Sequence, residues 1–213
     1  MATSRPLSPR RRPVQGRSRE TVEVILAAAA QVLERQGLAG FTTNAVALRA
    51  GVSIGSLYQY FPNKESLTAA LIERSTESLR ASLAEAVDRA AALPFQAGLA
   101  LLVNAAAAHQ IARPSLERTL DDQEQRLGLA GLEDRNIALI QAEIVRFLEP
   151  HRASLVITDL SRAAGDALAI GRALIDAAAV RGDLDCATLE QHLVRTLCAF
   201  LTGTAQPTAS ETI

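Results

Sequence analysis

The sequence predicts an all-α protein with two parts, a three-helix unit near the N-terminus and a larger helical unit after it. Alanine and leucine prevail among its 213 residues, aromatic residues make up 3%, and there is no tryptophan. These are residues that favour helices over strands. Apolar residues recur at three- and four-residue spacings, and glycine or proline stands at the ends of these stretches. A hydrophobic fraction of 48% in a chain of this length is sufficient for a sizeable core.

The first amphipathic stretch predicts a helix from about Ser18 to Gln36, followed by Gly37 as its stop. Its apolar stripe consists of Val22, Ile25, Leu26, Ala29, Val32 and Leu33. This helix is expected to act as a scaffold for the segment that follows.

Residues 42–67, TTNAVALRAGVSIGSLYQYFPNKESL, predict two short helices around a tight turn and the start of a third. Thr42 or Thr43 can cap the first helix, because a threonine hydroxyl satisfies a free backbone N–H there. Gly51 can end this helix in the left-handed conformation that only glycine adopts freely. Ser53 can cap the second helix. This is helix-turn-helix organisation, in which the second helix reads DNA bases.

The second helix is short enough to have an outward face as well as an apolar one. Ile54, Leu57 and Phe61 follow the apolar spacing, and the outward residues are Gly55, Ser56, Tyr58, Gln59 and Tyr60. Tyrosine hydroxyls can donate hydrogen bonds to phosphate oxygens, although half-buried packing is the alternative for each ring.

Lys64, the only lysine of the chain, follows Asn63, which can cap the third helix. A cation in the first turn of a helix opposes the helix dipole. A DNA phosphate in front of Lys64 would resolve this conflict, and a solvated side chain is the alternative.

The stretch ALRAGVSIGSLYQYFPNKESL resembles the DNA-binding domain of the TetR family (TetR/AcrR type) of bacterial transcriptional regulators. The positions that match the family's spacing are Thr43, Val46, Ala47, Ala50, Gly51, Val52, Ser53, Gly55, Leu57, Tyr58, Tyr60, Phe61, Lys64 and Leu67. The resemblance extends upstream through residues 18–36 and covers about the first third of the chain. Beyond it, only size and helical character are similar.

The resemblance implies which residues face DNA: Thr43, Asn44, Ser53, Ile54, Gly55, Ser56, Tyr58, Gln59, Tyr60 and Lys64. Thr43, Tyr58, Tyr60 and Lys64 would mostly hold phosphates. Asn44, Ile54, Ser56 and Gln59 are better placed to read bases, and Ile54 could touch a thymine methyl group.

The distribution of charge agrees with DNA binding at one end. Residues 1–64 carry nine basic and three acidic side chains, a net charge of +6, and the remainder carries −7 of the total of −1. Residues 1–17 are rich in Pro, Arg and Ser, which predicts a disordered basic arm. This arm could lie along phosphates or in a minor groove, or it could be an inert solvated tail.

The expected domains are the arm at 1–17, the DNA-binding domain at 18–66, a helical regulatory and dimerisation domain at 67–203, and a tail at 204–213. Further helices are expected at about 63–91, 95–113, 114–125, 133–149, 155–180 and 185–202, with a loop at 127–132. The small apolar residues of the last two helices, 155–181 and 185–202, suit a two-fold dimer interface, and the family resemblance implies the same.

The candidate effector-binding residues are Asn104, His109, Gln110 and Phe147. The first three lie on an almost entirely apolar helix, and a buried polar group needs a partner. That partner could be a ligand or an internal hydrogen bond. Apolar surroundings imply a mainly apolar effector, although any core has apolar walls. Asp121, Asp122 and Glu124 are too close in sequence to converge on a metal, and they predict a solvated acidic face.

The leading hypothesis is a homodimeric repressor that binds double-stranded DNA at a palindromic operator and is released by a small ligand. A DNA-binding regulator without an effector is the alternative. An enzyme is less favoured, because the three histidines have no nucleophile or metal spacing around them. No cofactor or metal is expected. No apolar run reaches the ~18 residues of a membrane span, and a cytoplasmic location with reduced thiols at Cys186 and Cys198 is expected.

Overall fold

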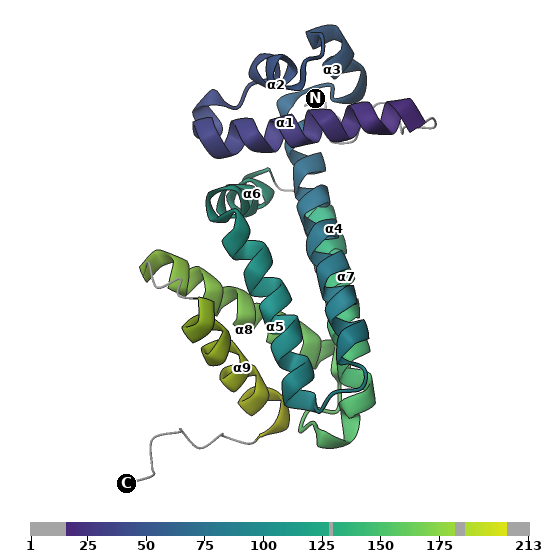
Figure 1. The fold of residues 1–213 in the computed structure, drawn as a ribbon, viewed down its shortest axis with the longest axis vertical. Coiled ribbons are helices and arrows are strands. Elements are labelled where there is room, and N and C mark those ends of the chain that lie inside the picture. The colour runs from purple at the N-terminus through teal and green to yellow at the C-terminus, as the bar shows by residue number, and fades with distance from the viewer. Residues whose placement is uncertain (1–15, 128–129, 182–185, 204–213) are drawn as a thin grey trace, which may run out of the picture. The chain divides into compact units, whose positions relative to one another are not determined.

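The computed structural model describes residues 16–127, 130–181 and 186–203, and these residues are all helical apart from turns and short connections (Figure 1). The predicted all-α class is therefore confirmed. Of the predicted arm at 1–17, residues 1–15 lie outside the described residues, as does the tail from 204 onward, whereas residues 16 and 17 are helical and begin the first helix. Within the described part, no helix has both the length and the hydropathy needed to cross a membrane.

The helices follow one another along the chain with short connections. Their bounds are α1 (Gly16–Gly40), α2 (Thr43–Ala50), α3 (Ile54–Tyr60), α4 (Lys64–Ala90), α5 (Phe95–Ala112), α6 (Pro114–Arg126), α7 (Ala130–Leu148), a 3₁₀ helix (Glu149–Ser154), α8 (Leu160–Arg181) and α9 (Cys186–Thr202).

The scaffold helix α1 buries the apolar stripe that its sequence predicts. Ile25 and Ala29 are fully buried, and Leu33 is almost so. Gly37 has a φ of 61° and a ψ of −170°, which interrupts the helix where a stop is expected. The three residues after it form a further turn that ends at Phe41, whose N–H donates to the Gly37 carbonyl (3.1 Å).

The start of α8 differs from the prediction of a helix from about residue 155. Residues 155–159 are not helical, and the Val156 N–H donates instead to the Leu201 carbonyl at the end of α9 (2.9 Å). Asp159 then accepts a hydrogen bond from the Arg162 N–H (3.0 Å) and so caps α8. The β-branched residues before Asp159 favour an extended chain, and aspartate is a preferred N-cap, so the helix begins after it. Helix α7 instead begins earlier than predicted, at Ala130, and so shortens the expected loop at 127–132.

The chain folds into two compact units. The N-terminal unit comprises residues up to Glu77 together with Arg113–Asp134, and the C-terminal unit comprises Ser78–Ala112 together with residues from Arg135 onward. This division differs from the predicted boundary at residues 66 and 67. The first half of α4 belongs to the N-terminal unit and its second half to the C-terminal unit. Helix α6 is part of the N-terminal unit.

Helix α6 joins the N-terminal unit through its apolar face. Leu116 and Leu120, both 4% exposed, lie in the same buried cluster as Phe41, Leu57 and Phe61. On the polar side, the Ser75 hydroxyl of α4 donates to Glu117 of α6 (2.6 Å). Helix α6, which the sequence assigns to the regulatory domain, thus packs in the N-terminal unit.

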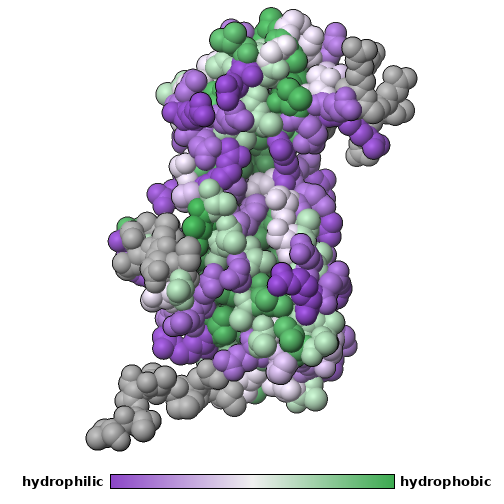
Figure 2. All heavy atoms as spheres, in the orientation of Figure 1, coloured by the Kyte–Doolittle hydropathy of each residue, from purple (hydrophilic) through white to green (hydrophobic). Residues whose placement is uncertain are grey.

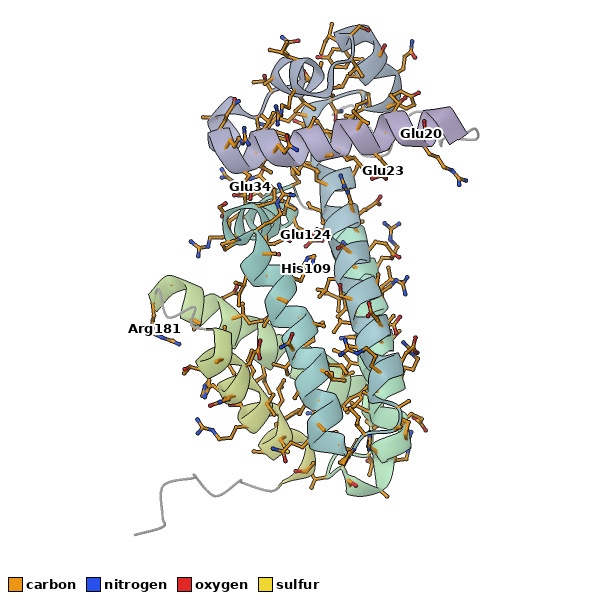
Figure 3. The ribbon with its side chains drawn as sticks, viewed as in Figure 1. Glu20, Glu23, Glu34, His109, Glu124 and Arg181 are labelled. Carbon is orange, nitrogen blue, oxygen red and sulfur yellow. The ribbon has the colours of Figure 1, made fainter. Side chains whose placement is uncertain are left out.

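An ion pair holds the start of α6 to α1 within the N-terminal unit. Arg113 donates from Nη2 to Glu34 Oε2 (2.5 Å) and from Nε to Glu34 Oε1 (3.3 Å). Figure 3 shows Glu34 on the side of α1 that meets α6. The hydrogen bond from Arg113 holds the pKa of Glu34 below its ordinary value of 4.5.

This ion pair predicts an acid-sensitive contribution to stability. A lowered pKa in the folded state means that the stabilisation is present above the ordinary pKa and is lost as pH falls through the folded pKa. At neutral pH, Glu34→Gln is expected to reduce the free energy of unfolding by about 0.2–1 kcal/mol, because the pair is partly solvated. The difference between wild type and variant, measured by chemical denaturation from pH 7 to pH 3, should shrink below pH 4.5. Glu20→Gln on the exposed start of α1 is the control and should show no such pattern.

The C-terminal unit has a core of its own. Its buried cluster draws side chains from the second half of α4 and from α5, α7, α8 and α9, among them Leu83, Leu102, Phe147 and Leu193. Helix α9 packs against both α5 and α8. On the face drawn in Figure 2, hydrophobic side chains (green) lie between hydrophilic ones (purple) over this unit.

Arginine–carboxylate pairs attach the second half of α4 to α7. Arg146 donates to Asp88 (2.6 Å), and Arg80 donates to Glu143 (3.0 Å). The C-terminal portion of α4 is therefore fixed to the C-terminal unit, and its N-terminal portion begins in the other unit.

Candidate nucleic-acid interface

Three caps shape the helix-turn-helix of α2 and α3. The Thr42 hydroxyl accepts from the Ala45 N–H (3.1 Å), so the structure selects Thr42 of the two candidate caps. Gly51 ends α2 with φ 66° and ψ 27°, the left-handed conformation that the sequence predicts. Ser53 caps α3 by accepting from the Ser56 N–H (3.0 Å). Because each cap is local in sequence, the turn between the helices forms as predicted.

The inner face of the two helices is anchored in the core. Val46 on α2 and Leu57 on α3 are fully buried, as is Phe61 immediately after α3. Ile54 shares their apolar spacing but is 37% exposed, and so it belongs to the outer face. The anchoring of α3 fixes which of its residues face solvent.

The outer face of α3 is polar with two aromatic rings. Tyr58 is 43% exposed, and Gly55 and Gln59 are also exposed. Ser56 and Tyr60 are half-buried. Asn44 is exposed on α2, and Thr43 is half-buried at its start. The predicted DNA-facing residues of α3 therefore divide into exposed side chains and side chains held partly by the protein.

Both tyrosine hydroxyls have partners on other helices. Tyr58 Oη lies 3.1 Å from Thr43 Oγ1, which joins α3 to α2. Tyr60 Oη accepts a hydrogen bond from the Ser18 hydroxyl at the start of α1 (3.3 Å). The rings are therefore tied to neighbouring helices, and Tyr58 is the more exposed of the two.

The Ser53 and Ser56 hydroxyls are hydrogen-bonded to each other, with an Oγ–Oγ distance of 2.8 Å. This bond is in addition to the cap that Ser53 provides. This pair keeps the first turn of α3 rigid. The Ser56 hydroxyl, which the sequence places among the base-reading groups, therefore has a neighbouring hydroxyl as one partner.

Lys64 has two partners within the N-terminal unit. Its Nζ donates to the Leu38 carbonyl (3.1 Å) and lies 5.3 Å from the centroid of the Phe41 ring. The carbonyl and the ring face compensate the ammonium charge. Asn63 and Ser66 cap the same helix reciprocally, with Asn63 Oδ1 2.7 Å from the Ser66 N. The conflict with the helix dipole is thus relieved inside the protein, and it no longer argues for a phosphate in front of Lys64.

Two residues of the N-terminal unit were missed by sequence reasoning. Ser18 contacts Tyr60 across 42 positions, and nothing local to Ser18 signals this contact. Leu48 is 85% exposed on α2, one helical turn beyond Asn44.

The candidate effector residues all lie in the C-terminal unit, but their environments differ. Asn104 is exposed, and its side-chain amide donates to Glu190 of α9 (3.1 Å), so the expectation of a buried polar group fails there. His109 and Gln110 are half-buried near the end of α5. Phe147 is 3% exposed.

Phe147 belongs to a cluster of three rings. Its centroid lies 5.6 Å from that of Phe95 and 5.2 Å from that of His151. A Cβ added at Gly98 would lie 2.7 Å from the Phe147 ring, so the cluster is tightly packed on α5. Asn104 and Phe147 therefore have separate sets of partners.

The acidic residues of α6 are not a uniformly solvated face. Asp122 is exposed, but Glu124 is only 8% exposed, so the prediction is wrong for Glu124. Glu124 lies four residues after Leu120, and so it shares the face that α6 buries in the N-terminal unit. Among the residues that the structure describes, no three His, Cys, Asp or Glu side chains gather as metal ligands would.

Two family models match the chain, one over each part. Residues 25–71 match the model "Bacterial regulatory proteins, tetR family", and residues 94–201 match the model "Tetracyclin repressor-like, C-terminal domain". The first covers the helix-turn-helix described above. The second covers α5 to α9 almost completely.

Two relatives are similar over about a third of the chain. The HTH-type transcriptional regulator CymR of Pseudomonas putida is 42% identical over 83 residues, which are 37% of this chain and 41% of CymR. The nucleoid occlusion factor SlmA of Haemophilus ducreyi is 36% identical over 69 residues, which are 32% of this chain and 33% of SlmA. The matches thus span less than half of either relative.

Solved structures share the fold over most of the chain. A putative TetR-family regulator from Mesorhizobium loti has a TM-score of 0.70 at 20% identity, with 87% of this chain and 97% of that chain covered. A complex of SmeT, the repressor of a Stenotrophomonas maltophilia multidrug efflux pump, with triclosan has a TM-score of 0.63 at 20% identity and covers 90% and 100%. At this identity, the likeness concerns the fold alone.

Proposed function

The chain belongs to the TetR family of DNA-binding transcriptional regulators, and we propose that it acts as a homodimeric repressor on a palindromic operator. The family consists of regulators and not of enzymes. The observation that carries the proposal is the outer face of α2 and α3, where hydroxyl, amide and aromatic groups are held outward on a capped, core-anchored helix pair. Such a face suits the major groove.

We assign two kinds of DNA contact to this face. Thr43, Tyr58 and Tyr60 offer hydroxyls to phosphates. Lys64 is assigned to phosphate by the family resemblance, with its ammonium group also bonded to the Leu38 carbonyl. Asn44, Ile54 and Gln59 are exposed and serve as the base-reading side chains, with Ser56 and Gly55 keeping the start of α3 slim. Ser53 acts as the cap that fixes this start.

The proposed dimer forms through α8 and α9. The exposed face of α8 carries the small residues Ala169 and Ala173, with Arg162 before them and Asp176 after them. In a two-fold arrangement, small residues allow close approach of the helices, and opposite charges at the two ends of the face can pair. Two copies of α3 would then lie about one DNA turn apart.

The proposed effector is a small, mainly apolar molecule bound in the C-terminal unit. The proposed location of the protein is the cytoplasm, where bacterial DNA lies. The apolar and aromatic core of this unit supports that class, and the triclosan complex of SmeT is an example on the same fold. Such a ligand releases DNA only if it binds the DNA-free conformation more tightly. A regulator without an effector remains the alternative, and thermal stabilisation by apolar compounds distinguishes the two.

The experiment that tests the proposal is a mobility shift with purified protein and the DNA that flanks its own gene, at two salt concentrations. A discrete, salt-sensitive complex at a palindrome, with two subunits per site, is the expected result. Smeared binding that does not depend on sequence would contradict a specific operator repressor.

The two kinds of contact predict two patterns of mutational effect. Tyr60→Phe and Lys64→Ala are expected to weaken binding by similar factors on all operator variants, and Lys64→Ala should lower the salt slope by about one per contact. Ile54→Ala and Gln59→Ala are expected to change sequence preference, measured by competition between operators with single base changes. Thermal unfolding of each variant is the control, since Lys64 also has partners inside the unit. Four variants that simply unfold would overturn this assignment.

A further inference from the structure

The hydrogen bond between Ser18 and Tyr60 joins the start of α1 to the end of α3. Ser18 Oγ donates to Tyr60 Oη over 3.3 Å, and both residues are half-buried. The Tyr60 ring also packs against the buried cluster of the N-terminal unit. The ring position is therefore set by packing, and the hydroxyl has one protein partner on α1.

The direction of this hydrogen bond determines which kind of group the Tyr60 hydroxyl can still bind. A phenol has one proton to donate and accepts at its oxygen. Because Tyr60 Oη accepts from Ser18, its own proton is left for an acceptor outside the protein. A phosphate oxygen is purely an acceptor, and a donor that is itself hydrogen-bonded is polarised toward such a group.

Tyr58 differs in this respect. Its bond to Thr43 can run in either direction, so the structure does not reserve the Tyr58 proton for an outside acceptor. The two tyrosines that we place against phosphates are thus not equivalent, and Ser18 accounts for the difference.

We propose that Ser18 is a positioning residue for DNA binding, which orients the Tyr60 hydroxyl to donate to a backbone phosphate. This inference rests on the proposed function. Ser18 lies outside the helix-turn-helix and outside the residues matched by the N-terminal family model, which begins at residue 25. With Ser18 in this role, the residues that serve DNA binding extend to the first turn of α1, and Ser18 itself need not contact DNA.

The test is a double-mutant cycle on operator affinity with the full-length protein. Ser18→Ala is expected to weaken binding by about three- to tenfold per subunit, the range of one hydrogen bond. The same change made in a Tyr60→Phe background should have no further effect, since the hydroxyl it orients is absent. Ser18→Thr retains the donor and should restore affinity. The salt slope should stay unchanged, because no charge is removed.

A matched control separates positioning from simple stabilisation. Ser75→Ala also removes a hydroxyl that bonds across two helices of the N-terminal unit, but its partner is Glu117 on α6. It is expected to lower the thermal unfolding temperature and to leave operator affinity unchanged.

The other outcomes of the cycle contradict the inference in distinct ways. If Ser18→Ala weakens binding equally in both backgrounds, Ser18 contacts DNA itself and does not act through Tyr60. If it lowers only the unfolding temperature, its role is structural. If wild-type protein binds no operator, the proposed function fails, whereas a binding wild type with an unaffected Ser18→Ala variant overturns this inference alone.

Discussion

Phe61→Ala is expected to lower the free energy of unfolding of the N-terminal unit by about 3–5 kcal/mol. The Phe61 ring is 0% exposed in the cluster that also holds Leu57 and Val46. Its backbone N–H ends α3 by donating to the Leu57 carbonyl (2.9 Å), so the ring anchors the helix at its final turn. Since whole domains are stable by only about 5–15 kcal/mol, the loss should also abolish operator binding at growth temperature.

The measurement is chemical denaturation followed by far-UV circular dichroism, with operator affinity measured at low temperature in parallel. Tyr58→Ala is the matched control, because it removes another aromatic ring three residues earlier that is 43% exposed. Tyr58→Ala should change stability little and weaken DNA binding strongly. A Phe61→Ala protein with wild-type stability would contradict the assignment of this ring to the core.

Features of the helix-turn-helix that depend on neighbouring residues could be predicted from the sequence. Gly51 is the one residue type that adopts its positive φ without strain, and Ser53 lies three residues before the N–H that it caps. Asn63 caps α4 in the same way. Each of these signals lies within four residues of its effect, so the positions of α2, α3 and the start of α4 were predictable.

Contacts between distant segments were not predictable in this way. Lys64 was expected to need an anion, but its partner is the carbonyl of Leu38, 26 positions earlier. A cation in the first turn of a helix does need a compensating group, and in the structure the Leu38 carbonyl provides it. The same limit applies to Ser18 and Tyr60, whose contact depends on how α1 crosses the end of α3.

Helix α6 shows why a hydrophobic pattern does not assign a helix to a domain. The spacing of Leu116 and Leu120 predicts a buried face, and nothing in the spacing says which core receives it. The structure places both residues in the N-terminal core, although the flanking helices α5 and most of α7 lie in the C-terminal unit. The burial of Glu124 follows from this docking and could not be read from the run of acids.

Leu120→Ala is expected to cost about 2–5 kcal/mol of the stability with which α6 is held in the N-terminal unit. Leu120 is 4% exposed there, as is Leu116, and the polar attachments of α6 include the Ser75–Glu117 bond and the Arg113–Glu34 pair at its start. Polar bonds at a partly solvated surface contribute about 1 kcal/mol each, less than a buried leucine.

Hydrogen exchange measures this effect directly, as loss of amide protection in residues 114–126 relative to α2 and α3. Arg118→Ala changes an exposed residue of the same helix and is expected to leave protection unchanged. Equal protection in Leu120→Ala and wild type would mean that Leu116 and the polar attachments hold α6 without Leu120.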